Sequence, residues 1–240
     1  MGISAGITLA AYGAYTGFIW LRYGRARPSS RDEVDAILDQ FMPSYDVAIR
    51  NDIQVDAPAA ITQRAATGLD IQRLTVAGAL FTARARLLGG TRDTQNQEEA
   101  ETERLSALLP WMESLGWIVL ATVPDREVIV GTITRPWEAN PTPRVVPATQ
   151  FAAFHEPGYV KIATAWGAMP ARADACQFTV RTRVTATDAA ARRRFRRYWA
   201  LFSPGSLLIR VVASRLIKGK AERQTLSTYS EAGPLYHGPA

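Results

Sequence analysis

The first 21 positions of the chain form a mostly apolar run that carries no charged side chain. As an α-helix this run would be about 30 Å long, close to the thickness of the hydrocarbon core of a bilayer. Arg22, Arg25 and Arg27 follow the apolar run, whereas a signal peptide carries its basic residues before it. The pattern predicts a transmembrane helix over residues 1–23, with a buried core helix or a cleaved leader as the alternatives.

Small residues form a stripe along this predicted helix. Glycine or alanine recurs every four residues, with two more glycines beside the stripe, and the set is Gly2, Gly6, Ala10, Gly13, Ala14 and Gly17. Small residues let two helix backbones approach closely, so the stripe predicts packing against another membrane helix. The alternative is that the stripe faces lipid.

Helical and strand-like patterns alternate after the apolar run. Residues 24–43 form a predicted juxtamembrane linker that ends in a short amphipathic helix. Apolar residues then alternate with polar ones over 47–55, which indicates a strand, and Pro58 is well placed to open a helix. A second helical pattern covers 78–88 and ends at Gly89, and the polar segment after it predicts a surface loop.

Short alternating segments separated by turn residues dominate the second half of the chain. They predict an antiparallel sheet, and a Thr187 or Asp188 cap then begins a long helix. Pro204 and Gly205 predict a break in that helix, with a second helix after it. Residues 224–240 lack periodicity and predict a flexible or partner-bound tail.

Three sequence segments in the second half of the chain resemble a known superfamily. They are "DREVIVGTITRPW", "FAAFHEPGYVKIATAW" and "RTRVTATDAAARRRFRRYWALFSPGSLLIR". Together with the element order they resemble uncharacterised bacterial members of the START-like (SRPBCC, polyketide cyclase-like) superfamily over roughly residues 44–220. The resemblance implies an α+β helix-grip fold for a domain over residues 44–223. In this fold a curved antiparallel sheet wraps around a long C-terminal helix, with an apolar cavity between them.

Aromatic residues on the predicted strands and loops are the candidates to line such a cavity, or else they fill the core. They are Trp117, Trp137, Phe151, Phe154, Tyr159, Trp166 and Phe178.

The basic charge of the chain is concentrated in one segment. Residues 188–223 hold ten basic and two acidic residues, a net charge of +8, so the rest of the chain sums to −2. At helical spacing, Phe195 and Trp199 share a face that must be buried, which leaves the arginines toward solvent. Since nucleic-acid binding needs exposed aromatics among the cations, we expect no nucleic-acid partner. Contact with lipid headgroups or another anionic surface is predicted for Arg192, Arg193, Arg196 and Arg197, with a merely solvated face as the alternative.

Catalytic signatures are absent from the sequence. Cys176 is the single cysteine, and His155 and His237 are the only histidines, so a metal site or a histidine relay would have few parts. His155 beside Glu156 is more typical of an exposed turn than of a base and its orienting carboxylate. We expect no catalytic residues, no metal and no cofactor.

These patterns favour one functional hypothesis over a second. The first is a non-catalytic accessory or structural subunit of an inner-membrane complex, of which respiratory and photosynthetic assemblies are examples. The positive-inside rule then predicts a single-pass protein of the bacterial inner membrane, with its N-terminus outside and its domain in the cytoplasm. The alternative is a membrane-tethered binder or carrier of a lipid, a quinone or another apolar ligand, and a cyclase-like activity is a weaker third.

Overall fold

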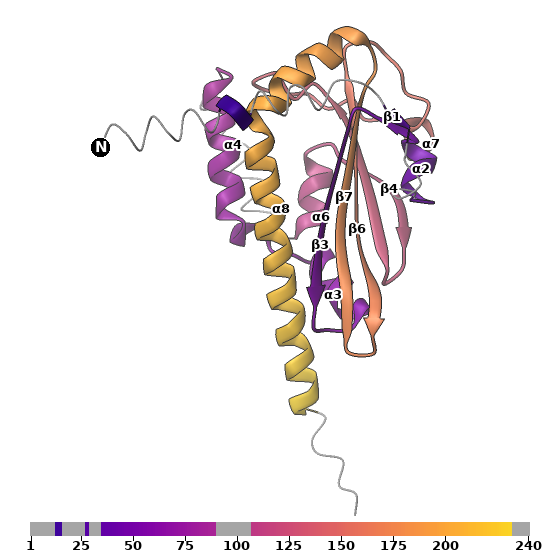
Figure 1. The fold of residues 1–240 in the computed structure, drawn as a ribbon, viewed down its shortest axis with the longest axis vertical. Coiled ribbons are helices and arrows are strands. Elements are labelled where there is room, and N and C mark those ends of the chain that lie inside the picture. The colour runs from indigo at the N-terminus through magenta and orange to yellow at the C-terminus, as the bar shows by residue number, and fades with distance from the viewer. Residues whose placement is uncertain (1–12, 16–26, 29–34, 90–106, 232–240) are drawn as a thin grey trace, which may run out of the picture.

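The alternating segments form one five-stranded antiparallel sheet (Figure 1). The computed structural model describes residues 13–15, 27–28, 35–89 and 107–231. The strand order is β3-β7-β6-β5-β4, with β3 and β4 at the edges. The bounds are β3 Val47–Val55, β4 Ile118–Val123, β5 Glu127–Thr134, β6 Val160–Arg172 and β7 Ala175–Ala186. Two short strands, β1 Arg27–Pro28 and β2 Ser44–Tyr45, pair beside it.

The register of the sheet gives it two different faces. In β6 the even-numbered residues, from Val160 to Ala168, face one side, and the odd-numbered residues, from Lys161 to Ala165, face the other. The first side packs against α3 Ala59–Thr67, α6 Leu108–Ser114 and α8 Ala189–Glu231. The second side packs against α2 Leu38–Phe41 and α7 Ala148–Phe151.

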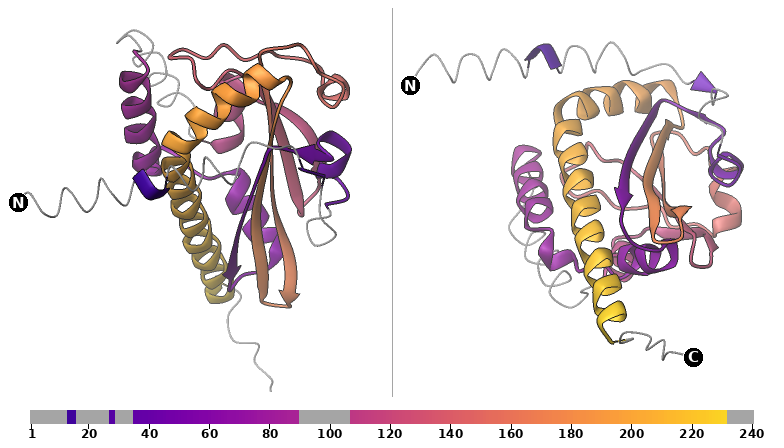
Figure 2. Two further views of the ribbon diagram at one scale, coloured as in Figure 1. Left: turned by 45° about the horizontal axis from the view of Figure 1, so that its top comes forward. Right: turned by 60° about the horizontal axis from the view of Figure 1, so that its bottom comes forward.

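Helix α8 begins two residues after β7 and bends sharply on its way along the sheet (Figures 1 and 2). Pro204 lies inside this single helix, so the predicted break at Pro204 and Gly205 is wrong. Proline removes one backbone hydrogen bond and crowds the preceding turn, which bends a helix that tertiary contacts hold together on both sides. Helix α4, Thr75–Leu87, packs on α8 opposite the sheet, where Gly205 lies against Leu80.

The start of α8 is fixed by side-chain capping. Asp188 Oδ1 accepts hydrogen bonds from the backbone N–H of Ala190 (2.6 Å) and Ala191 (2.9 Å), which confirms Asp188 as the predicted cap. Its other oxygen accepts from the N–H of Gly158. Arg192, one turn into the helix, pairs with the buried Asp46 at 2.6 Å. The helix start is therefore tied to the segments that immediately precede β6 and β3.

The predicted boundaries of the other segments agree only in part. The helix expected before residue 43 is present as the four-residue α2, and the helix expected from residue 58 is α3. The helix expected over 78–88 is α4, which ends before Gly89 at φ +80°. Helix α8 continues to Glu231, so the first part of the predicted tail is helical. The remaining tail, the predicted loop after residue 90 and most of residues 1–23 lie outside the described residues.

Helix α8 also bears on the membrane prediction. Within the described ranges, Ala189–Thr228 is long and apolar enough to cross a membrane by length and composition, with a mean hydropathy of 1.4 over its most apolar 18-residue window. Core helices of soluble proteins meet the same criterion. Phe195, Trp199, Ile217 and Ala221 are each at most 7% exposed and pack in the sheet's core clusters. One face of α8 is therefore occupied by protein.

Paired charges stabilise the second face of the sheet. Arg181 on β7 pairs with Glu127 and with the buried Asp35, and the distance to Asp35 is 2.9 Å. Arg183, two residues along the same strand and 4% exposed, pairs with Asp39 and donates to Met42 O at 2.8 Å. Because a buried cation is costly without a partner, these pairs fix the segment around α2 on the sheet.

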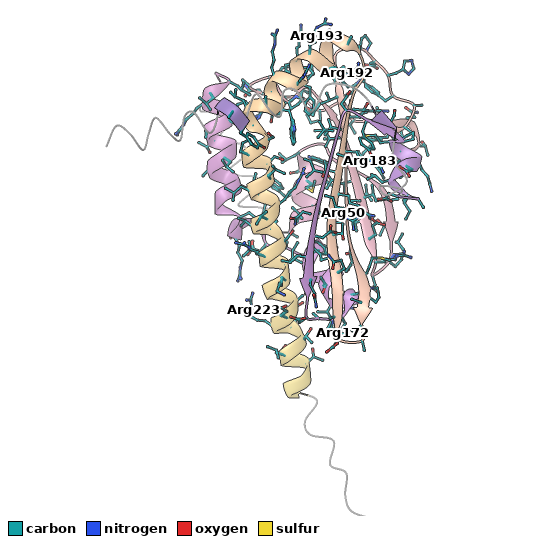
Figure 3. The ribbon with its side chains drawn as sticks, viewed as in Figure 1. Arg50, Arg172, Arg183, Arg192, Arg193 and Arg223 are labelled. Atoms are coloured by element: carbon teal, nitrogen blue, oxygen red, sulfur yellow. The ribbon has the colours of Figure 1, made fainter. Side chains whose placement is uncertain are left out.

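We predict that Arg183→Met lowers the free energy of unfolding by about 3 kcal/mol, because it leaves a partly buried carboxylate and a carbonyl without their cation. Chemical denaturation measures the loss. The matched control is Arg172→Met at an exposed site on β6, which should change stability by less than about 0.5 kcal/mol. Equal losses for the two variants (both residues are labelled in Figure 3) would contradict this assignment.

The cap at Asp188 predicts a pH dependence. Hydrogen bonds from the backbone N–H of Ala191 and Gly158 hold the pKa of Asp188 below its ordinary value. The ionised form therefore adds stability above the unfolded-state pKa of about 3.9, and this contribution is lost as pH falls through the lower folded-state pKa. Asp188→Asn should lower the free energy of unfolding at pH 7 by about 0.5 kcal/mol.

Denaturation at pH 7 and pH 3 measures the difference between this variant and the original chain. The difference should shrink at the lower pH, and a difference that grows instead would contradict the role of the ionised cap.

Candidate ligand site between helix α8 and the sheet

Arg210 occupies the face of α8 that is turned toward the protein interior. Ser203, Ser214, Ile217 and Ala221 lie at helical spacings of seven, four, seven and eleven residues from it, and each is at most 3% exposed. A guanidinium at this position lies in the middle of a helix face whose other buried residues are uncharged.

The Arg210 guanidinium has no compensating partner among the described residues. Its Nη1 atom is buried and makes no hydrogen bond, and no described carboxylate forms an ion pair with it. Burial lowers the pKa of Arg210 to about 10, because desolvation disfavours the charged form. The residue nevertheless keeps some accessible surface, so it is not completely enclosed by protein.

The alignment of α8 with β3 shows which part of the sheet Arg210 faces. Asn51 Nδ2 donates to Ser214 Oγ at 2.9 Å, and further along Lys218 Nζ donates to Gln54 O at 2.8 Å. The helix and β3 therefore run in the same direction, and four helix residues correspond to three strand residues between these two contacts. From the rise per residue of a helix and of a strand, Arg210, one turn before Ser214, is expected near Ile49.

The sheet is polar at that level. Ile49 pairs with Thr182, and Thr182 pairs with Thr164 across the two central strands. The hydroxyls of Thr164 and Thr182 are 2.9 Å apart. A group placed between Arg210 and this threonine pair would meet a cation on one side and two hydroxyls on the other.

Apolar side chains around this level are incompletely packed. Ile162 on β6 and Val180 on β7 point toward α8 from the second and third strands of the sheet, yet both are only half-buried. Covered central strands normally bury such residues fully, as Val130 on β5 is buried here. Ile162 and Val180 therefore keep accessible surface on the α8 side of the sheet.

Unpaired polar atoms are concentrated on the same side of the sheet. Besides Arg210 Nη1, buried atoms without a hydrogen-bond partner include Trp166 Nε1, Trp199 Nε1 and Gln63 Oε1. Buried polar groups in folded proteins are normally satisfied by protein, water or ligand. This side of the sheet thus offers donors and an acceptor to a bound molecule.

The structure divides the seven predicted cavity residues among three clusters. Trp166 and Phe178 are buried on the α8 side with the half-buried Trp117, and Trp137 packs near the start of α8. The other three, Phe151, Phe154 and Tyr159, lie on the opposite face of the sheet. The aromatics therefore do not line one cavity, because strand alternation separates them.

The predicted anionic-surface arginines also divide. Figure 3 labels Arg192 and Arg193 on the segment of α8 before the bend. Arg193 and Arg197 are exposed. Arg192 pairs with Asp46, and Arg196 is half-buried and also has an interaction partner. Phe195 stacks on Trp199 with ring centroids 5.8 Å apart, which confirms the predicted buried aromatic face. Of the four arginines predicted to contact an anionic surface, Arg193 and Arg197 are therefore the two that are exposed.

Most of the predicted membrane-helix stripe lies outside the described residues, apart from Gly13 and Ala14. The short described helical segment 13–15 contacts α8, where the hydroxyls of Tyr15 and Ser203 are 3.3 Å apart. This contact is close to Pro204 and thus to the bend.

Other candidate chemistry is sparse. His155 is exposed, and its Nδ1 lies 2.7 Å from Ala153 O, while Glu156 pairs with Arg144 instead. Across the described ranges, no three His, Cys, Asp or Glu side chains gather into a group that could hold a metal ion.

Arg210 was not among the residues singled out from the sequence. It lies within "SLLIRVVAS", and an arginine between apolar residues at core spacing is the signal that could have identified it.

Comparisons with known proteins give little further information. No family model matches the chain, and no curated protein matches it. A solved structure that it is similar to is the Zhui aromatase/cyclase from Streptomyces sp. R1128, with 11% identity and a TM-score of 0.27. The match covers 74% of this chain and 94% of that one. Backbones that superpose this loosely carry no argument about fold or activity.

Proposed function

We propose that this protein binds an elongated apolar molecule with one anionic group in the space between α8 and the sheet. The observation that supports this proposal is the guanidinium of Arg210, whose buried Nη1 has no hydrogen-bond partner and which has no ion-pair partner among the described residues. A carboxylate or phosphate would offset the desolvation of that cation and form charge-assisted hydrogen bonds with its fork of N–H donors. The half-buried Ile49, Ile162 and Val180 are suited to an apolar body.

Among the ligands expected from the sequence, this arrangement favours an acidic lipid over a quinone. A quinone is neutral and would leave the Arg210 charge uncompensated, whereas a fatty acid or a lipid phosphate would not. In this proposal the protein is a membrane-tethered binder or carrier, anchored by the predicted helix 1–23, and it performs no chemistry on its ligand. The Thr164 and Thr182 hydroxyls act as additional hydrogen-bonding groups for the ligand head.

A photoactivatable fatty acid and its methyl ester test this proposal on the full-length chain in membranes. We expect the acid to label peptides from β6, β7 and α8, and Arg210→Met to reduce that labelling about tenfold, because one charge-assisted contact is lost. The ester should label weakly in both chains. Arg215→Met, an exposed position on the same helix, is the matched control and should label like the original chain. Equal labelling by acid and ester would contradict a role for the charge.

A second candidate function is docking as an accessory subunit of an inner-membrane complex. An outward apolar stripe on α8 favours it, since Leu201, Leu208 and Val211 are 51%, 48% and 37% exposed. They recur at helical spacing of seven and three residues around the bend, and exposed apolar stripes are typical of interaction surfaces. The stripe and the predicted small-residue helix would then contact the same membrane partner.

Replacing Gly6, Ala10, Gly13 and Gly17 together by leucine tests the docking function. We expect the variant to separate from larger assemblies during native electrophoresis in mild detergent, because leucine prevents close helix approach. Ala5→Leu with Ala11→Leu, off the stripe, is the matched control and should still comigrate. Comigration of both variants would rule out docking through the stripe.

A further inference from the structure

A pocket lies on the opposite side of the sheet from Arg210. It has a volume of about 430 Å³ and lies between the α2–β2 connection, the segment after α7 and the adjoining ends of β6 and β7. Its rim is open to solvent, because Ser44, Ala153 and His155 are exposed.

Lys161 on β6 lines this pocket and is only 8% exposed. Its Nζ donates to Ala152 O at 2.8 Å, with Phe151 O at 3.4 Å. These carbonyls close the short helix α7. An ammonium has three N–H donors, so one donor is left after both carbonyls are counted.

The charge of Lys161 is uncompensated, unlike that of its neighbours on the same face. Arg181 and Arg183 on β7 each pair with carboxylates, whereas no described carboxylate pairs with Lys161. Backbone carbonyls satisfy donors but supply no negative charge. Burial accordingly lowers the pKa of Lys161. A purely structural cap for α7 would not require a buried cation in the centre of a sheet.

The pocket lining is rich in hydrogen-bond donors and contains no acidic residue. Besides Lys161 it includes the His155 imidazole and the hydroxyls of Ser44 and Thr185, whereas the Gln40 amide and the Thr187 hydroxyl already donate to Ala36 O and Tyr159 O. Thr185 is the direct cross-strand neighbour of Lys161 on β7. A lining of one cation and several neutral donors is complementary to an anion, because no acidic side chain in the lining would repel it.

We propose that this pocket binds a phosphate or carboxylate group, with Lys161 as its charged ligand. The site is separate from the Arg210 site, since the two residues lie on opposite faces of the sheet. The anion is either a free metabolite group or the headgroup of a membrane lipid, because both present the same oxygens to Lys161.

The chain's three lysines, Lys161, Lys218 and Lys220, allow a direct test on the full-length protein. Amine acetylation of each lysine is followed by mass spectrometry in phosphate, in acetate and in chloride at equal ionic strength. At ten times the dissociation constant, inorganic phosphate should slow acetylation of Lys161 about tenfold, because only the free fraction reacts. Lys218 and Lys220 serve as internal controls and should be unaffected.

Vesicles distinguish the two sources of the anion. Protection of Lys161 by phosphate or acetate in solution supports a free anion. Protection only by vesicles containing phosphatidic acid, and not by phosphatidylcholine alone, supports a lipid headgroup. Acetylation of Lys161 at the same rate under all these conditions would overturn the proposal.

Substitutions provide an independent measurement. Lys161→Met should abolish phosphate binding in calorimetric titration, and Lys220→Met should bind like the original chain. If Lys161→Met fails to fold, the acetylation of the original chain still decides the question.

Discussion

The two-residue connection between β7 and α8 is the constraint on which the arrangement of the sites depends. Thr187 and Tyr159 exchange hydrogen bonds, Thr187 N to Tyr159 O at 3.0 Å and Tyr159 N to Thr187 Oγ1 at 3.1 Å, while Asp188 caps the helix. A connection this short makes α8 start at the end of the sheet. The bend at the Pro204 segment then brings the rest of the helix along the sheet, and Arg210 follows that bend by less than two turns.

The register of the β6–β7 hairpin gives the two faces different chemistry. On one face, Arg181 and Arg183 pair with carboxylates and fix the α2 segment, whereas Lys161 has backbone carbonyls but no described carboxylate as its partners. On the other face, Arg210 has none within the described chain. Because unpaired buried charges oppose folding, a protein that keeps two of them at the borders of internal space is expected to use them.

The sequence predicted the element order well, because it depends on local patterns. Alternation marked β3 and β5 to β7, and the spacing of Phe195 and Trp199 marked the buried face of α8. Contacts between residues far apart in the sequence were harder to predict. Nothing in the sequence near Arg192, for example, indicates that Asp46 is its partner. The bend at Pro204 was predicted as a break, since a local rule does not include the contacts with α4 and the sheet that keep the helix continuous.

The candidate cavity was predicted less well for the same reason. Aromatic residue type suggested seven lining residues, but Phe151 on helix α7 and Trp166 on β6 lie on opposite faces of the sheet. Arg210 becomes conspicuous only when the helix is placed against the sheet. The sequence did indicate a long helix packed over a sheet, and the proposed ligand site lies between these two elements.

Native mass spectrometry of the full-length chain, released from its own membrane by mild detergent, tests the central claim most directly. The account predicts a mass greater than that of the chain by one acidic amphiphile, and loss of that extra mass in Arg210→Met. An original chain that carries no small molecule, or an extra mass that Arg210→Met retains in full, would contradict it.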